Sequence, residues 1–243
     1  MIYNITKTTF NEYGIRSGDM IAIINFLQWF RKKENNPNIQ LHFLPDIIKS
    51  YDYCQKFYKF LHTNYDYFTD IKGDANLPFD QLMLWDFRDI IGDHVSLNNF
   101  KTMKDKITIF PIYDAGYHTY RNWTSKLLDE LLKYYSHQYP HHEKLLCVRD
   151  VPTMDIELYD FVISTDYIKN INHIMESKIF IGGDTGVSHF ASALDKPPSQ
   201  LIYYYNGRGM LHTLPFHLFE GKGTLKRYWH NCYKTTYNGE LVL

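Results

Sequence analysis

Residues 179–189 read Ile-Phe-Ile-Gly-Gly-Asp-Thr-Gly-Val-Ser-His, and they are the most informative segment of the chain. Apolar residues predict the end of a strand, the glycines predict a tight turn, and the small and hydroxyl residues predict the start of a helix. A helix N-terminus offers unpaired amides and a partial positive charge, which suits a diphosphate. The dipole contributes only about 0.3–1 kcal/mol at an exposed position, so further donors must help, and Thr185, Ser188 and His189 are the candidates. The alternative is a packing turn with Asp184 or Thr185 as the helix cap, because the run matches neither the P-loop nor the G-x-G-x-x-G fingerprint.

The second half of the chain alternates regularly between strands and helices. Strands are predicted at residues 107–113, 144–148, 161–164, 178–181 and 201–204, and helices at 122–135, 167–176 and 187–194. Short apolar strands that alternate with helices are typical of an α/β fold whose parallel sheet is covered on both faces. Such sheets bind ligands beyond the carboxyl ends of their strands.

The first half is less regular. Strands are predicted at residues 1–5, 40–44 and 82–85, with a helix at 20–33. A second helix, from Asp46 to about Thr63, is inferred from residues at helical spacing, which are Ile47, Ile48, Tyr51 and Cys54. Residues 64–80 are polar and interrupted by Gly, Asn and Pro, which predicts a loop, and residues 92–106 are the best candidate for a linker.

The composition excludes several classes of protein. Among 243 residues, 26 Lys and Arg oppose 27 Asp and Glu, so net charge gives no reason to expect sequence-blind binding of nucleic acid. A hydrophobic fraction of 44% and a charged fraction of 22% indicate a globular protein. Cysteine occurs only as Cys54, Cys147 and Cys232, which excludes a disulfide scaffold and fits a reducing compartment. The 21 tyrosines fill core positions or stack on sugars or bases, and composition does not separate the two.

The chain shows no sign of membrane insertion. The apolar run at residues 20–30 is too short to span a bilayer, and no basic-then-apolar leader opens the sequence. We therefore expect a cytoplasmic protein without a transmembrane segment, with the inner membrane surface left open as its place of work.

Residues 180–197, FIGGDTGVSHFASALDKP, closely resemble the donor-site motif of the heptosyltransferase-like glycosyltransferases, glycosyltransferase family 9. The family pattern is a strand followed by D-[ST]-G-x-x-H-x-A-x-A-x-x-x-P. Matching residues here are Asp184, Thr185, Gly186, His189, Ala191, Ala193 and Pro197. Two further segments agree with the family in order and spacing: the turn Ser17-Gly18-Asp19 before an apolar helix, and Arg121-Asn122-Trp123 after a strand.

The resemblance implies an α/β fold of two Rossmann-like domains that face each other across a cleft, the GT-B glycosyltransferase architecture. Residues 1–103 would form the N-terminal, acceptor-side domain. Residues 104–243 would form the C-terminal domain that binds the nucleotide sugar, together with a tail. The family members are usually longer, and the missing length falls mainly in the acceptor-side domain, so the acceptor is not carried over.

Roles for individual residues follow from the same resemblance. Asp19 maps to the catalytic base for the acceptor hydroxyl, and the alternative is that it caps its helix. Arg121 maps to the basic residue that contacts the donor phosphates, which a guanidinium grips in bidentate fashion. The remaining expected substrate-binding residues are Gly18, Gly183, Asp184, Thr185, Gly186, Ser188, His189 and Arg208.

No metal or other cofactor is expected. The sequence lacks the Asp-x-Asp pattern by which many glycosyltransferases hold a divalent ion on the diphosphate. The histidines at 137, 141 and 142 have no carboxylate or cysteine at ligand-like spacing, so they read as a polar loop.

The expected activity is inverting transfer of a hexosyl or heptosyl group from a nucleotide-diphosphate sugar to a glycan or lipid-linked glycan, as in polysaccharide biosynthesis. One alternative is a nucleotide-sugar epimerase or hydrolase on the same fold. The other is a binding module for a nucleotide sugar or glycan without catalysis. The sequence does not identify the donor sugar, its base or the oligomeric state.

Overall fold

The structure is a computed structural model of the chain, and the chain divides into two compact units. Described residues are 1–6, 14–44, 47–48, 50–77, 96–98, 101–112, 122–149, 159–183, 185–197, 200–206, 232–235 and 241–242. Unit 1 holds Met1–Ser96, and unit 2 holds the described residues from Leu97 onward. The division of the chain into domains at residues 1–103 and 104–243 stays a prediction.

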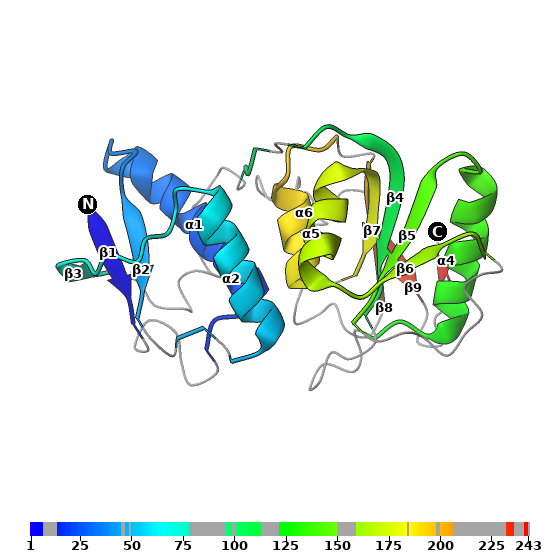
Figure 1. The fold of residues 1–243 in the computed structure, drawn as a ribbon, viewed down its shortest axis with the longest axis horizontal. Coiled ribbons are helices and arrows are strands. Elements are labelled where there is room, and N and C mark those ends of the chain that lie inside the picture. Colours follow the sequence, from blue (N-terminus) through cyan, green and yellow to red (C-terminus); the bar gives the residue numbers. More distant parts are fainter. Residues whose placement is uncertain are drawn as a thin grey trace. The chain divides into compact units, whose positions relative to one another are not determined.

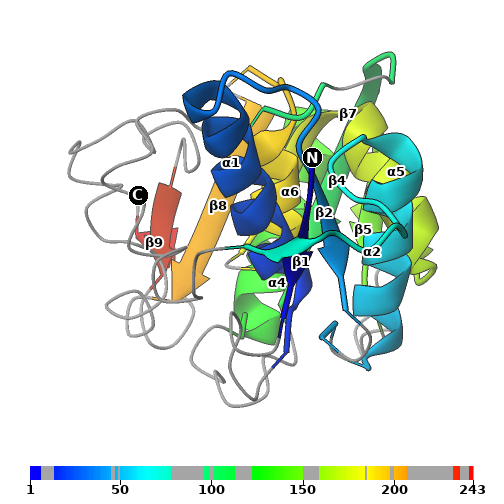
Figure 2. The same ribbon diagram turned by 90° about the vertical axis from the view of Figure 1, so that its left-hand side faces the viewer.

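Unit 1 is a small parallel sheet with two helices on one face (Figures 1 and 2). Its strands are β1 (Ile2–Ile5), β2 (Gln40–Phe43) and β3 (Ala75–Asn76), in the order β2-β1-β3. Its helices are α1 (Ser17–Lys33) and α2 (Asp52–Asn64). Tyr3 packs edge-on against Phe30 of α1, and Phe43 does the same against Tyr58 of α2, so alternate strand residues bury their rings under the helices.

The segment that leads to β3 crosses the opposite face of this sheet. Asn4 and Gly73 exchange two hydrogen bonds: Asn4 Nδ2 donates to the Gly73 carbonyl at 2.8 Å, and the Gly73 amide donates to Asn4 Oδ1 at 2.9 Å. A Cβ atom at residue 73 would lie 2.1 Å from the carbonyl oxygen of Ile2, so only glycine fits there. The predicted loop at residues 64–80 therefore contains a short strand that pairs with β1.

Unit 2 is built on a larger sheet. Its strands are β4 (Lys104–Phe110), β5 (Glu143–Cys147), β6 (Val162–Ser164), β7 (Ser177–Gly182), β8 (Leu201–Asn206), β9 (Cys232–Thr235) and β10 (Leu241–Val242). The order is β10-β9-β8-β7-β4-β5-β6, with every pair parallel except β10 with β9. From β6 to β9 this is the doubly wound order 3-2-1-4-5-6, in which the chain reverses direction between β4 and β7.

Helices cover both faces of the larger sheet (Figure 1). They are α4 (Ser125–Gln138) on one face, and α5 (Tyr167–Glu176) and α6 (Gly186–Ala193) on the other. Four leucines of α4 pack on alternate residues of the central strands, Ile107 and Ile109 on β4 and Ile179 and Ile181 on β7. The predicted α/β class with parallel sheets is confirmed.

Several predicted bounds are wrong. α2 begins at Asp52 rather than at 46, because Ile48 pairs with Ile15 and the Ile15 amide donates to the Ile47 carbonyl at 2.8 Å. β4 begins at Lys104, inside the predicted linker. The strand predicted at residues 82–85 lies outside the described residues.

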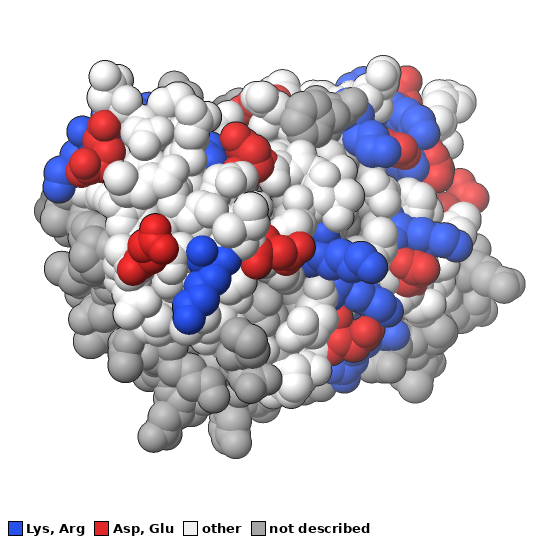
Figure 3. All heavy atoms as spheres, turned by 60° about the vertical axis from the view of Figure 1, so that its left-hand side comes forward, with Lys and Arg blue, Asp and Glu red and all other residues white. Residues whose placement is uncertain are grey.

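Charged side chains of both signs are intermixed on the face drawn in Figure 3. Among the described residues, Lys104 pairs with Glu176 at 2.9 Å and Lys178 with Asp105 at 2.9 Å. Within the described ranges, no helix is long and apolar enough to cross a membrane.

Candidate functional site

The segment that the sequence singled out lies at the point where the strand order reverses. β7 ends at Gly182, which pairs with Phe110 at the end of β4. The chain then passes Gly183 and Thr185 and enters α6. In doubly wound sheets, ligands bind in the crevice outside the carboxyl ends of the two strands at this reversal. The start of α6 therefore occupies the position where this architecture binds ligands.

Thr185 caps α6. Its backbone is extended, with φ of −137° and ψ of 163°, and its Oγ1 accepts a hydrogen bond from the Ser188 amide at 3.2 Å. Its carbonyl oxygen accepts from the His189 amide at 3.1 Å. Among the described residues, the amides of Gly186 and Val187 have no hydrogen-bond acceptor. These two amides are thus the donors that this helix presents to a ligand.

The two glycines before the helix make room for the chain's own side chains. A Cβ atom at Gly182 would lie 2.7 Å from Ser188 Oγ, and one at Gly183 would lie 2.5 Å from Ile112 Cδ1. Neither glycine has a positive φ. The sequence suggested that glycine admits a ligand here, whereas at these two positions the space is filled from inside unit 2.

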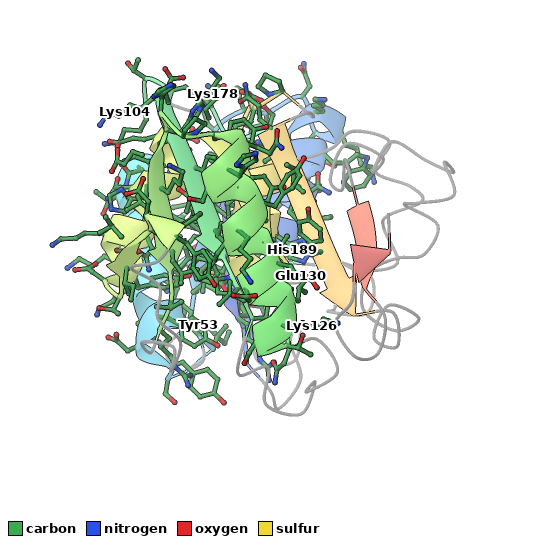
Figure 4. All side chains as sticks on the ribbon, turned by 90° about the vertical axis from the view of Figure 1, so that its right-hand side faces the viewer. Tyr53, Lys104, Lys126, Glu130, Lys178 and His189 are labelled. Atoms are coloured by element: carbon green, nitrogen blue, oxygen red, sulfur yellow. The ribbon has the colours of Figure 1, made fainter. Side chains whose placement is uncertain are left out.

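Ser188 has internal contacts. Its side chain is fully buried, and its Oγ lies 3.2 Å from Thr185 Oγ1. His189 lies further along α6 and is labelled in Figure 4. The parts of Ser188 and His189 in binding a donor stay predictions.

Trp123 ties the end of β4 to β8. Its amide donates to the Ile112 carbonyl at 2.7 Å, and its Nε1 donates to the Tyr204 carbonyl at 3.1 Å. The indole is buried and touches the position where a Cβ at Gly183 would lie. The helix predicted to begin at residue 122 is α4, which begins at Ser125 with Thr124 as its cap. The buried indole instead packs against the turn at Gly183 and holds it to β8 through the hydrogen bond to Tyr204.

The charged side chains of unit 2 divide between the two ends of its sheet. In Figure 4, Lys104 and Lys178 lie together at one end, where β4 and β7 begin, and Lys126 lies at the other end, near the start of α4. At the first end, Lys106 is buried, with Glu176 and Glu143 each 3.3 Å from its Nζ. This cluster is distant along the strands from the start of α6 and belongs to the packing of the sheet.

In unit 1, Asp19 lies in the first turn of α1, and Gly18 precedes it. Asp19 Oδ2 accepts a hydrogen bond from the backbone amide of Arg16, the residue at the N-cap, at 2.9 Å. This is one half of a capping box, so the helix-capping alternative for Asp19 has direct support. α1 begins at Ser17, ahead of the residue 20 that the sequence predicted.

The start of α1 is also held from α2. The Ile15 amide donates to the Ile47 carbonyl just before α2 at 2.8 Å, and Cys54 in the first turn of α2 is fully buried. Burial raises the pKa of the Cys54 thiol, and the charges of Arg16 and Asp19 act on it in opposite directions. The Cys54 sulfur therefore lies close to the predicted base. The sequence did not indicate this neighbour, because the start of α2 was misplaced.

Three expected site residues, Arg121, Asp184 and Arg208, lie outside the described residues. The structure brings Gly183, Thr185, Gly186, Ser188 and His189 together at the start of α6. Gly18 and Asp19 lie in the other unit. Across the described ranges, no three histidine, cysteine, aspartate or glutamate side chains are grouped to hold a metal ion.

No model of a known protein family matches the chain, and no curated protein matches it. A crystal structure described as a glycosyl transferase family 9 protein from Veillonella parvula DSM 2008 is similar in fold over 97% of this chain and 85% of that one. The TM-score is 0.48 and the sequence identity is 10%. A likeness this distant carries no argument about activity, so the proposals rest on the residues of this chain.

Proposed function

We propose that the chain is a metal-independent, inverting glycosyltransferase of GT-B architecture. It would move a sugar from a nucleotide-diphosphate sugar to a hydroxyl group of a glycan or lipid-linked glycan. One observation carries the proposal: the motif that resembles the family 9 donor site begins a helix at the strand-order reversal of a doubly wound sheet, where that architecture binds ligands.

The donor diphosphate would bind at the start of α6. The amides of Gly186 and Val187 would each donate to a phosphate oxygen, and the partial positive charge of the helix end would favour the anion. Arg121 would add a charged, bidentate contact. Because Thr185 fixes the first turn of α6, its cap would position both amides before the donor arrives.

The reaction needs a base and a leaving group. Asp19 would take the proton of the acceptor hydroxyl, whose oxygen would attack the anomeric carbon of the donor. The bond from that carbon to the diphosphate would break, and the nucleoside diphosphate would leave with the electron pair, so the configuration inverts. A positioned general base contributes roughly 10²–10⁴-fold in rate. The hydrogen bond from the Arg16 amide would hold the Asp19 carboxylate in one place.

Donor binding is tested by thermal denaturation with a panel of nucleoside diphosphates and their sugars. A ligand at 100 times its Kd stabilises by about 2.7 kcal/mol, which is a measurable shift. Thr185→Ala is expected to weaken that shift at least severalfold. Asp166→Ala is the matched control, because Asp166 caps α5 by accepting from the Lys169 amide at 2.9 Å, away from the motif. A full shift in Thr185→Ala, or no shift with any nucleotide, contradicts the proposed donor site.

Catalysis is tested by following nucleotide release and sugar transfer to an acceptor panel. Asp19→Asn is expected to lower the rate of transfer by roughly 10²–10⁴-fold while donor binding stays intact. Asp52→Asn is the control, since Asp52 is also an acid in the first turn of a unit 1 helix but forms an exposed pair with Lys56. Free sugar or an epimer without acceptor would instead favour a hydrolase or epimerase. Binding without turnover would favour a binding module.

A further inference from the structure

Two tyrosines at the start of α2 form an exposed stacked pair in unit 1. The rings of Tyr51 and Tyr53 lie nearly parallel, with 13° between their planes and 5.6 Å between their centroids. Rings stacked squarely in contact would lie about 3.5–4.0 Å apart, so these two are displaced sideways. Each ring therefore keeps part of its face uncovered by the other. Tyr51 is 48% exposed and Tyr53 is half-buried.

Helix stability does not account for Tyr51. It occupies the N-cap of α2, where its side chain makes no capping hydrogen bond. Ser, Thr, Asp and Asn are strongly preferred at this position because their short side chains accept from the first-turn amides. A large aromatic side chain that is exposed at a cap position breaks the local rule, and such breaks concentrate at functional sites.

The tyrosine pair lies beside the predicted base. The segment just before α2 lies beside the segment just before α1, because Ile48 pairs with Ile15 and the Ile15 amide donates to the Ile47 carbonyl at 2.8 Å. Burial raises the pKa of Tyr53, the contact with Cys54 adds to that rise, and the charge of Arg16 opposes it. The phenol therefore stays protonated and neutral at physiological pH. The tyrosine pair therefore lies at the end of unit 1 where α1 also begins, with Arg16 at the N-cap of α1 and Asp19 in its first turn.

This mixture of groups fits a sugar ring. A pyranose has apolar C–H faces, which pack on aromatic rings, and a rim of hydroxyl groups, which hydrogen-bond to charged and phenolic groups. The charged groups here are balanced in sign, with Arg16 and Asp19 at the start of α1 and the Asp52–Lys56 pair on α2, so they do not favour an ion over a neutral polyhydroxyl ligand. A nucleobase would use the ring faces equally well, but it would not use a carboxylate that takes a proton from a hydroxyl.

We propose that Tyr51 and Tyr53 form a stacking platform for a sugar ring of the acceptor, beside Asp19. The inference rests on the proposed function in naming the sugar as the acceptor. It also makes a separate claim, that unit 1 binds saccharides through Tyr51, and this claim is tested without turnover.

The test is saturation-transfer NMR with a panel of methyl glycosides in the millimolar range. Wild-type protein is expected to transfer magnetisation to ring protons of at least one glycoside. Tyr51→Ala is expected to weaken this transfer by roughly fivefold or more, and Tyr51→Trp to keep it, because tryptophan restores the ring face. Tyr134→Ala is the matched control, since Tyr134 is 53% exposed and lies on α4 in unit 2. Tyr53→Phe keeps the ring, so it is expected to keep most of the binding.

Each other outcome overturns the platform. Binding of no glycoside by the wild type, full binding by Tyr51→Ala, or an equal loss in Tyr134→Ala would do so. Melting temperatures of all variants, measured alongside, show that a lost signal is not lost folding. The shift in melting temperature that nucleotides cause reports separately on donor binding at α6, and so on the proposed function. Saccharide binding that depends on Tyr51 without any nucleotide binding would leave the platform standing and remove the transferase.

Discussion

The helices of the two units begin in different ways. In unit 2, α4, α5 and α6 start behind Thr124, Asp166 and Thr185, and each of these side chains accepts a hydrogen bond from a first-turn amide. In unit 1, α1 and α2 start behind Arg16 and Tyr51, and neither side chain makes a capping bond to its helix. Unit 2 therefore caps its helices with the N-cap side chain, whereas in unit 1 α1 is capped by Asp19 from its own first turn and α2 has no side-chain cap.

This difference coincides with the predicted chemistry. The hydrogen bonds at these helix starts in unit 1 are the Arg16 amide to Asp19 and the Ile15 amide to the Ile47 carbonyl. The first of these bonds is made by the predicted base itself. Residues that break a local rule are concentrated at functional sites, so the uncapped start of α2 at Tyr51 is consistent with the proposed stacking platform. The capped start of α6 shows the other solution, in which one residue both closes the helix and presents its amides.

The largest effect is expected in unit 2, from loss of the Trp123 side chain that packs against the motif. Trp123→Ala removes a buried indole and its hydrogen bond to the Tyr204 carbonyl, and large-to-small changes of this kind cost about 3–5 kcal/mol. Hydrogen exchange of the amides in α4 and β4 is expected to accelerate accordingly. Exchange in α1 serves as the internal control. If the amides of α4 exchange as slowly as in the wild type, the indole does not hold the end of β4 to β8 in the way that we describe.

A smaller loss is expected at the start of α1. Cys54→Ala removes a fully buried side chain where α2 begins, which costs roughly 0.5–3 kcal/mol, and it loosens the neighbouring turn that carries Asp19. Cys147→Ala is the control, because Cys147 is an equally buried cysteine in β5 of the other unit. Urea denaturation measures the stability, and transfer assays measure the rate. Equal loss of transfer in both variants would show that Cys54 acts only through packing.

Substitutions at the N-cap residues can reverse the difference in capping between α2 of unit 1 and α6 of unit 2. Tyr51→Asp gives α2 a side-chain cap and is expected to stabilise unit 1 by roughly 1 kcal/mol, while glycoside binding is lost. Thr185→Ala does the opposite at α6 and is expected to cost roughly 1 kcal/mol. Exchange rates of the first-turn amides of both helices report the two changes. Destabilisation by Tyr51→Asp would mean that Tyr51 is there to stabilise the fold.

The sequence predicted most of unit 2 because its signals are local. The helix predicted at residues 167–176 is α5 (Tyr167–Glu176), and the structure shows Asp166, a preferred cap residue, at its start. Thr185 was one of the two predicted caps of α6. Strands β9 and β10 were missed, because their residues show no apolar run of strand type.

The site in unit 1 was harder to predict because it depends on distant partners. Ile47 and Ile48 have helical spacing, but backbone pairing with Ile15 keeps them extended, and tertiary contacts override such a weak local preference. Once the start of α2 is misplaced, the tyrosine pair cannot be placed beside Asp19. The prediction that the glycines of the motif admit a ligand was wrong for a related reason. The side chain that fills the space at Gly183 comes from Ile112, which no local pattern reveals.

The smallest expected effect is a pH dependence confined to unit 2. His173 on α5 has its Nδ1 3.2 Å from Lys106 Nζ, and burial, followed by the charge of Lys106, lowers the pKa of this imidazole below 6.5. Glu143 and Glu176 oppose the shift and Lys104 adds to it. The unfolded chain then binds the proton more readily than the folded one. The stabilising contribution is therefore complete above pH 6.5 and is lost as the pH falls toward the folded pKa.

His173→Gln is expected to flatten this dependence in denaturant titrations from about pH 8 to about pH 5. If His173→Gln also flattened the pH dependence of hydrogen exchange in α1 of unit 1, the assignment of this dependence to His173 would be contradicted.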